Sequence, residues 1–77
     1  MITGALSYNE ENERYGLLTS DSDDWEIEGF HCGEALEVWD NGTKQWIPTR
    51  IEMRHSDEWY LVGYSGALEG LTIRVND

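Results

Sequence analysis

The chain has 77 residues and carries 16 acidic side chains against five Lys and Arg, a formal net charge of −11. This length allows one domain, residues 1–77, and leaves no room for a deep, closed substrate cavity. So strong a negative charge repels nucleic acid and anionic membranes but attracts basic proteins. We therefore expect neither direct nucleic-acid binding nor membrane binding.

The cysteine content and the N-terminal residues indicate a cytoplasmic protein. Cys32 is the single cysteine, which excludes an internal disulfide. Residues 1–16 have neither the basic segment nor the apolar segment of a signal peptide. No stretch approaches the roughly 20 apolar residues of a membrane span.

Alternation of apolar and polar side chains recurs along the chain, while a helical period is hard to find. The expected extended segments are residues 3–8, 14–18, 25–30, 34–39, 45–53, 59–64 and 71–75. Of these, 25–30 is a short strand or an irregular arm, and 59–64 is a central strand. Polar or glycine-containing turns separate them. We therefore predict an all-β fold, in which five or six antiparallel strands close into a small SH3-like barrel.

The hairpin formed by residues 34–39 and 45–53 has the clearest pattern. Its turn contains Gly42 after an asparagine, a residue suited to positive φ. One face is expected to enter the core with Leu36, Val38, Ile47 and Ile51. Pro48 cannot donate a ladder hydrogen bond, so its stretch is expected at an edge or bulge.

The opposite face of this hairpin carries Trp39 and Trp46. An outward pair of tryptophans surrounded by charged residues is typical of a protein-interface hot spot. The alternative is that both rings cap one open end of the barrel. Stacking of nucleic-acid bases on the pair is disfavoured by the surrounding negative charge.

The acidic residues are distributed unevenly along the chain. Residues 1–43 hold eleven acids against Arg14, whereas residues 44–77 hold five acids against four bases. The run from Asp21 to Glu28 does not fit an EF-hand, because a calcium loop beginning at Asp21 lacks the required Gly and Glu. The candidate partner-binding acids are Glu10, Glu11, Glu13, Asp21, Asp23, Asp24, Glu26 and Glu28. The alternative is that the charge serves only solubility.

His31, Cys32 and His55 are the only side chains besides the carboxylates that could bind zinc. His31 and Cys32 lie between Gly29 and Gly33, where a tight bend could turn both inward. A zinc ion held there would be structural. The alternatives are a buried apolar cysteine and surface histidines.

An enzymatic function is not expected. The chain has no nucleophile elbow, no supported Cys–His arrangement and no phosphate-binding glycine loop. At this density of carboxylates, pairs arise by chance and do not indicate a glycosidase. A glycosidase also needs a long saccharide cleft, which a chain of this length cannot form.

The segments RYGLLTSD, GFHCGEALEVWDNG, WIPTRIEMRHSDEWYLVGY and LEGLTIRV together resemble a small domain-of-unknown-function family of phages and conjugative elements of Gram-positive bacteria. The resemblance extends from Gly4 to Val75, and its most specific parts are residues 31–34 (HCGE) and 59–63 (WYLVG). It implies a small all-β fold and a mobile-element origin, and it carries no activity or functional residues. In size and acidity the chain also resembles the anti-CRISPR inhibitors of type II RNA-guided nucleases, some of which present carboxylates in place of DNA phosphates.

From the charge and these resemblances we expect an inhibitor that acts by binding. Its acidic residues would dock on a basic groove of a nucleic-acid-handling protein in the bacterial host cell and block DNA loading, as an anti-CRISPR does. The alternative is an accessory domain of a phage or conjugative element that recruits a protein through the Trp39 and Trp46 face.

Overall fold

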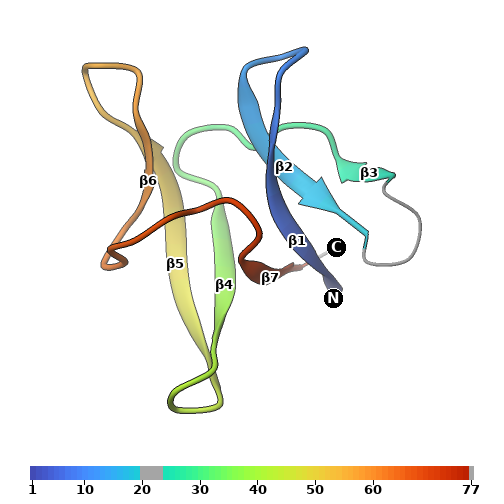
Figure 1. The fold of residues 1–77 in the computed structure, drawn as a ribbon, viewed down its shortest axis with the longest axis vertical. Coiled ribbons are helices and arrows are strands. Elements are labelled where there is room, and N and C mark those ends of the chain that lie inside the picture. The colour runs from blue at the N-terminus through green and yellow to red at the C-terminus, as the bar shows by residue number, and fades with distance from the viewer. Residues whose placement is uncertain (20–23, 77) are drawn as a thin grey trace.

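The computed structural model describes residues 1–19 and 24–76, and these form seven β-strands (Figure 1). The strands are β1 (Ile2–Asn9), β2 (Arg14–Leu18), β3 (Trp25–Ile27), β4 (Ala35–Asp40), β5 (Gln45–Met53), β6 (Trp59–Leu61) and β7 (Thr72–Val75). No helix occurs in the described residues, and therefore none that could cross a membrane. The all-β prediction is confirmed, whereas the expected number of five or six strands is wrong.

All neighbouring strands are antiparallel, in the order β3-β2-β1-β7-β4-β5-β6, and the sheet curls into a half-barrel. The last strand, β7, lies between β1 and β4 and joins the two hairpins, with Gly4 opposite Ile73 and Val38 also opposite Ile73. The two edge strands, β3 and β6, have three residues each. The SH3-like relationship stays a prediction.

The two long hairpins share one turn design. Four residues separate paired Asn9 and Arg14, and four separate paired Asp40 and Gln45. The side-chain oxygen of Asn9 or Asp40 accepts a hydrogen bond from the backbone N–H two residues later, which initiates the turn. The last turn residue is left-handed in both, Glu13 at φ 57° and Lys44 at φ 58°. The expectation that Gly42 takes positive φ is therefore wrong, because the turn has four residues between the strands rather than two.

The core lies on the concave side of the curled sheet. Its buried apolar side chains come from every strand except β3 and from two connecting segments: Leu6, Leu17, Phe30, Leu36, Val38, Ile51, Leu61, Leu68, Ile73 and Val75. Phe30 follows β3, and its backbone N–H donates to the carbonyl of Tyr15. This bond brings the irregular segment after β3 over the core.

Contacts between the two ends of the sheet narrow the opening of the half-barrel. The indole N–H of Trp59 in β6 donates to the carbonyl of Glu13, 3.3 Å away, in the turn between β1 and β2. The Arg14 guanidinium lies 5.8 Å from the centre of the Trp59 ring. The expectation of a central strand over 59–64 is wrong. β6 ends at Leu61 on the sheet edge, because the N–H of Tyr64 turns back to the Leu61 carbonyl and Gly63 adopts φ 78°.

Candidate binding surfaces

Six exposed carboxylates gather beside the edge strand β3. We call this group the acidic edge: Glu10, Glu11, Glu13, Asp24, Glu26 and Glu28. Its first three members lie in the turn after β1, and the others lie in and beside β3. Asp21 and Asp23, the remaining candidates, fall outside the described residues.

Two asparagine side chains hold the parts of the acidic edge together. The amides of Asn9 and Asn12 both donate to the carbonyl of Glu28, at 3.0 and 2.9 Å. Glycine at position 16 lets this segment approach, because a Cβ there would clash with the carbonyls of Ile27 and Glu28. The turn and β3 therefore form one surface although about ten residues separate them in the sequence.

Three acids outside the acidic edge have cationic partners, whereas the other described acids outside it (Glu34, Asp40, Asp57 and Glu69) have none. Elsewhere Glu37 pairs with Arg74 at 2.5 Å, Glu58 with Arg54 at 2.8 Å, and Glu52 with Arg50 at 3.9 Å. In the described part of the chain, no member of the acidic edge forms an ion pair. The nearby Arg14 instead donates to the Phe30 carbonyl at 3.0 Å. Six of the ten described acids without an ion-pair partner thus belong to the acidic edge.

The second predicted surface, the tryptophan face, consists of Glu37, Trp39, Trp46 and Arg74 on the outer side of β4, β5 and β7. Trp39 and Trp46 are cross-strand neighbours whose rings meet edge to face, with centroids 5.3 Å apart. The Arg74 guanidinium lies 4.3 Å from the Trp46 ring centre and its Nε donates to Glu37. Both indoles are half-buried, so the face is an ordered network that still presents aromatic surface.

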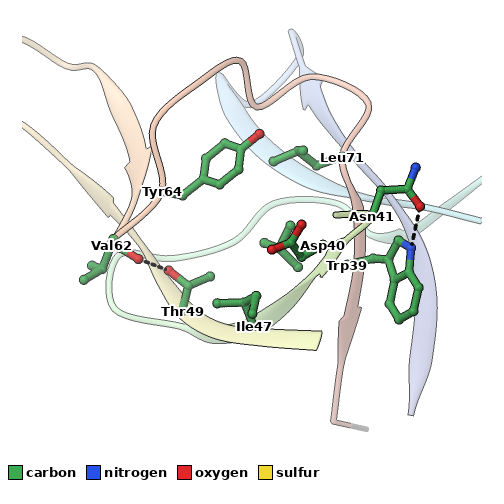
Figure 2. A pocket seen from close by; sticks show the side chains of 10 residues that line it. Trp39, Asp40, Asn41, Ile47, Thr49, Val62, Tyr64 and Leu71 are labelled. Carbon is green, nitrogen blue, oxygen red and sulfur yellow. Dashed lines mark hydrogen bonds between the residues drawn. The ribbon is translucent and has the colours of Figure 1, made fainter. Parts of the chain in front are cut away.

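A pocket on the concave side of the β4–β5 hairpin was not predicted from the sequence. This hairpin pocket has a volume of about 410 Å³ and is lined by Val38, Trp39, Asp40, Asn41, Ile47, Thr49, Val62, Gly63, Tyr64 and Leu71 (Figure 2). Ile47, expected in the core, is 42% exposed at its wall. Alternation predicted its face correctly, but no strand or loop within residues 1–19 and 24–76 covers this part of that face. An unexpectedly exposed isoleucine could not be found from periodicity alone.

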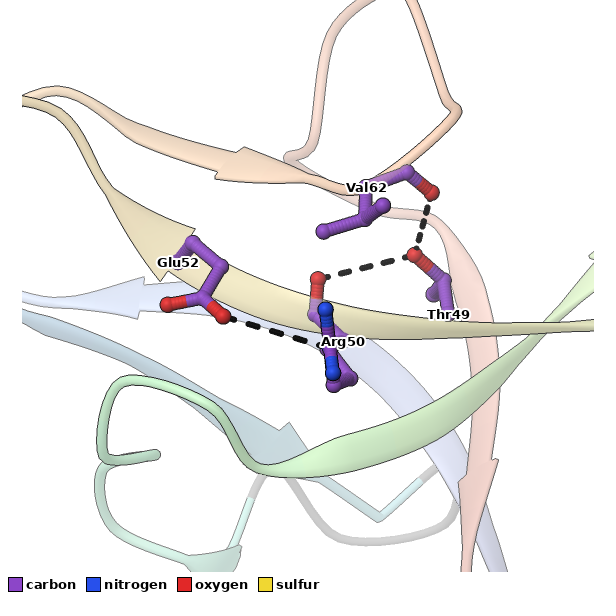
Figure 3. A network of polar contacts seen from close by, with 4 residues as sticks. All are labelled: Thr49, Arg50, Glu52 and Val62. Carbon is purple, nitrogen blue, oxygen red and sulfur yellow. Dashed lines mark hydrogen bonds and ion pairs between the residues drawn. The ribbon is translucent and has the colours of Figure 1, made fainter.

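One wall of the pocket is fixed by a short polar network at the start of the segment after β6. The Thr49 hydroxyl donates to the Val62 carbonyl at 2.6 Å (Figure 3). The Val62 N–H also donates to the Arg50 carbonyl. The Nε of Arg50 lies 3.9 Å from a carboxylate oxygen of Glu52. Pro48 lies just before this point, where β5 has no neighbour on its second side, so the predicted edge position is confirmed.

Among the ionisable groups of the described residues, Tyr15 is the one whose pKa is shifted. Burial raises the pKa of the Tyr15 hydroxyl above 10.0, and the negative charge of Glu69 and the neighbouring Tyr8 add to the effect. The rings of Tyr8 and Tyr15 meet edge to face at 5.3 Å. Glu69 is held there by the Ser7 hydroxyl at 2.6 Å and the Tyr8 N–H at 3.0 Å.

The three candidate zinc ligands are all exposed. His31 and Cys32 lie in the turn before β4, and His55 lies in the turn between β5 and β6. Across residues 1–19 and 24–76, no three His, Cys, Asp or Glu side chains form a group that could hold a metal ion. The structure thus gives no geometric support to the zinc hypothesis, which stays a prediction.

Comparison with known proteins places the chain in a family. No curated protein matches it. The crystal structure of a protein from Ruminococcus gnavus, a structural genomics target, is similar with 39% sequence identity and a TM-score of 0.79. The match covers 95% of this chain and 99% of that one. The family model described as domain of unknown function DUF5348 matches residues 4–75. The chain therefore belongs to the DUF5348 family.

Proposed function

We propose that this domain is a binding protein that inhibits a nucleic-acid-handling protein of a bacterial cell by docking its acidic edge on a basic surface. The observation that carries the proposal is the set of six exposed carboxylates without ion-pair partners among the described residues. Such a surface attracts a basic partner over several ångströms and orients its approach. The domain performs no chemistry in this account.

The geometry of β3 suits the replacement of DNA phosphates. Asp24, Glu26 and Glu28 alternate with half-buried Trp25 and Ile27, so the three carboxylates share the exposed side of an extended segment. Alternate residues of a strand are about 6.7 Å apart. One DNA strand carries a charge about every 3.4 Å of helix axis. The segment therefore offers about half that charge density, which the three glutamates of the neighbouring turn supplement.

The partner that we would test first is a type II RNA-guided nuclease, because small acidic inhibitors of these enzymes resemble the chain in size and charge. In this proposal the protein originates from a phage or conjugative element and acts in the host cytoplasm. The domain would occupy the basic groove that receives target DNA and so block DNA loading.

The experiment measures binding of labelled target DNA to a guide-loaded type II nuclease by fluorescence anisotropy, with increasing amounts of this protein. The test variant is Asp24→Asn, Glu26→Gln and Glu28→Gln, and the matched control is Glu52→Gln, Asp57→Asn and Glu58→Gln. Both change the net charge from −11 to −8. Exposed ion pairs contribute about 0.2–1 kcal/mol each, so the test variant should inhibit about tenfold more weakly.

The control variant should inhibit like the wild type, and inhibition by the wild type should weaken steeply with added salt. Equal effects of the two variants would show that total charge, and not the acidic edge, determines binding. No inhibition by the wild type at low salt would refute this choice of partner.

A second candidate function is supported by the tryptophan face. Its ordered, half-buried rings could anchor a protein partner of a mobile element, with the charge serving solubility. Trp39→Ala with Trp46→Ala should then abolish partner binding, while the variant of Asp24, Glu26 and Glu28 spares it. The reverse pattern supports the acidic edge, provided that circular dichroism shows both variants folded.

A further inference from the structure

The end of the β4–β5 hairpin extends beyond the rest of the sheet, and this leaves its concave face open. β7 pairs with β4 only at Glu37 and Val38, and β6 pairs with β5 only from Ile51 to Met53. Residues 39–46 consequently pair only with each other, Ile47 and Pro48 pair only with Val38 and Glu37, and the hairpin projects from the body of the molecule (Figure 1). The hairpin pocket lies on this uncovered face.

Exposed apolar side chains are concentrated around this pocket. Of the described residues, five large hydrophobic side chains are exposed, and three of them line it: Ile47 at 42%, Val62 at 41% and Tyr64 at 37%. Tyr64 and Leu71 face Ile47 and Thr49 across the opening (Figure 2). A partner that covers this apolar surface would gain a binding free energy of about 25 cal/mol for each square ångström buried.

The polar groups of the pocket select the charge of its occupant. None of the ten lining residues is cationic, and Asp40 contributes a carboxylate. One Asp40 oxygen accepts from the Gly42 N–H at 2.9 Å, and no Lys or Arg within residues 1–19 and 24–76 pairs with this carboxylate. The Tyr64 ring adds a face on which a cation can stack.

We propose that the hairpin pocket binds an arginine side chain of a basic protein partner. The aliphatic stem of arginine would contact Ile47 and Val62, and its guanidinium would reach the Asp40 carboxylate and the Tyr64 ring. This inference deepens the proposed function and takes the choice of a basic partner from it. The acidic edge would attract the partner, and the pocket would anchor it.

A second copy of the chain is the competing occupant, and its charge disfavours it. Two molecules of net charge −11 repel each other, and the pocket itself holds an anionic and no cationic side chain to offset this. Sedimentation at 0.15 M NaCl should accordingly show a monomer, and a dimer broken by Ile47→Asp would refute the assignment.

The test uses N-acetyl-arginine amide as the probe and N-acetyl-citrulline amide, its uncharged isostere, as the matched control. Each is titrated into the full chain at constant ionic strength while ¹H–¹⁵N spectra are recorded. Arginine amide should cause saturable shifts at Ile47, Val62 and Tyr64, and citrulline amide should bind at least about threefold more weakly. Equal binding of the two probes, or shifts spread along the acidic edge, would overturn the proposal.

Two pairs of variants assign the contacts. Asp40→Asn keeps an oxygen for the Gly42 N–H and should weaken arginine amide about two- to fivefold, whereas Asp57→Asn should not. Tyr64→Leu should weaken the binding of arginine amide by a similar factor. The control Tyr8→Leu changes a tyrosine that is equally exposed, at 39%, but lies outside this pocket, and should have no effect.

The outcomes separate this inference from the proposed function. If arginine amide binds the pocket but the nuclease is not inhibited, the pocket assignment stands and the proposed partner fails. If the nuclease is inhibited and Asp40→Asn and Tyr64→Leu inhibit as the wild type does, the pocket assignment fails and the acidic edge remains.

Discussion

The substitution Gly16→Ala tests how β3, and with it half of the acidic edge, is held on the sheet. A Cβ at Gly16 would lie 2.9 Å from the Glu28 carbonyl oxygen and closer still to that of Ile27. Real Cβ contacts essentially never fall below 3.0 Å, and both neighbours here are backbone atoms. The segment after β2 would have to move by roughly 1 Å, as overpacked sites do.

The expected loss of stability follows from that movement. Overpacking destabilises by about 1–3 kcal/mol, and displacement of the Glu28 carbonyl weakens two hydrogen bonds from asparagine amides that contribute about 1 kcal/mol each. We expect a decrease in the free energy of unfolding of about 3 kcal/mol. A domain of this size is stable by about 4–12 kcal/mol, so the melting temperature should fall by about 12–24 °C.

Gly42→Ala is the matched control, since the nearest atom to its Cβ would be an Asp40 carboxylate oxygen at 3.4 Å. Its free energy of unfolding should change by less than about 0.5 kcal/mol. Urea denaturation followed by tryptophan fluorescence measures both variants. A Gly16→Ala protein as stable as the Gly42→Ala protein would refute the described packing of β3 against β2.

Three further predictions concern pH, an ion pair and salt. Because burial raises the pKa of Tyr15 above 10.0 in the folded state, this group stabilises the fold below pH 10 and loses that contribution as the pH rises further. Urea midpoints at pH 9 and 11 should therefore differ less in Tyr15→Phe than in the wild type, and equal differences would contradict the burial. Arg74→Gln removes both the bond to Glu37 and the contact with Trp46, and should decrease the free energy of unfolding by about 1 kcal/mol. Arg50→Gln, whose ion pair is long and exposed, should have almost no effect, and equal urea midpoints for the two variants would contradict the described network. Raising NaCl from about 10 mM to 0.5 M should increase the melting temperature, because it screens the repulsion of a −11 charge, and a decrease would contradict this reasoning.

The sequence was sufficient to predict most of the extended segments and the direction of their side chains, but not the number of strands or the end of β6 at Leu61. Alternation placed Trp39 and Trp46 on the face opposite Val38, and the structure has them there. The conformation of the turns was predicted less accurately. The sequence favoured Gly42 as the residue with positive φ. The four-residue turns after Asn9 and Asp40 instead place positive φ at Glu13 and Lys44.

The hairpin pocket could not be predicted, because the alternation of apolar and polar residues indicates on which face of a strand a side chain lies. It does not indicate which other segment covers that face. Ile47 and Ile51 share a face of β5, yet Ile51 is buried and Ile47 is exposed. The difference arises because β6 reaches only as far as Ile51 and β7 only as far as Val38. Those end points depend on tertiary contacts such as the Thr49–Val62 hydrogen bond.

The most direct test of the account is a capture experiment from host lysate at low and high salt, quantified by mass spectrometry. The baits are the wild type, the variant neutralised at Asp24, Glu26 and Glu28, and the variant neutralised at Glu52, Asp57 and Glu58. The account predicts a basic nucleic-acid-handling protein that the wild type and the second variant retain at low salt, and that the first variant and high salt release. Retention by all three baits alike, or release only when Trp39 and Trp46 are replaced, would contradict it.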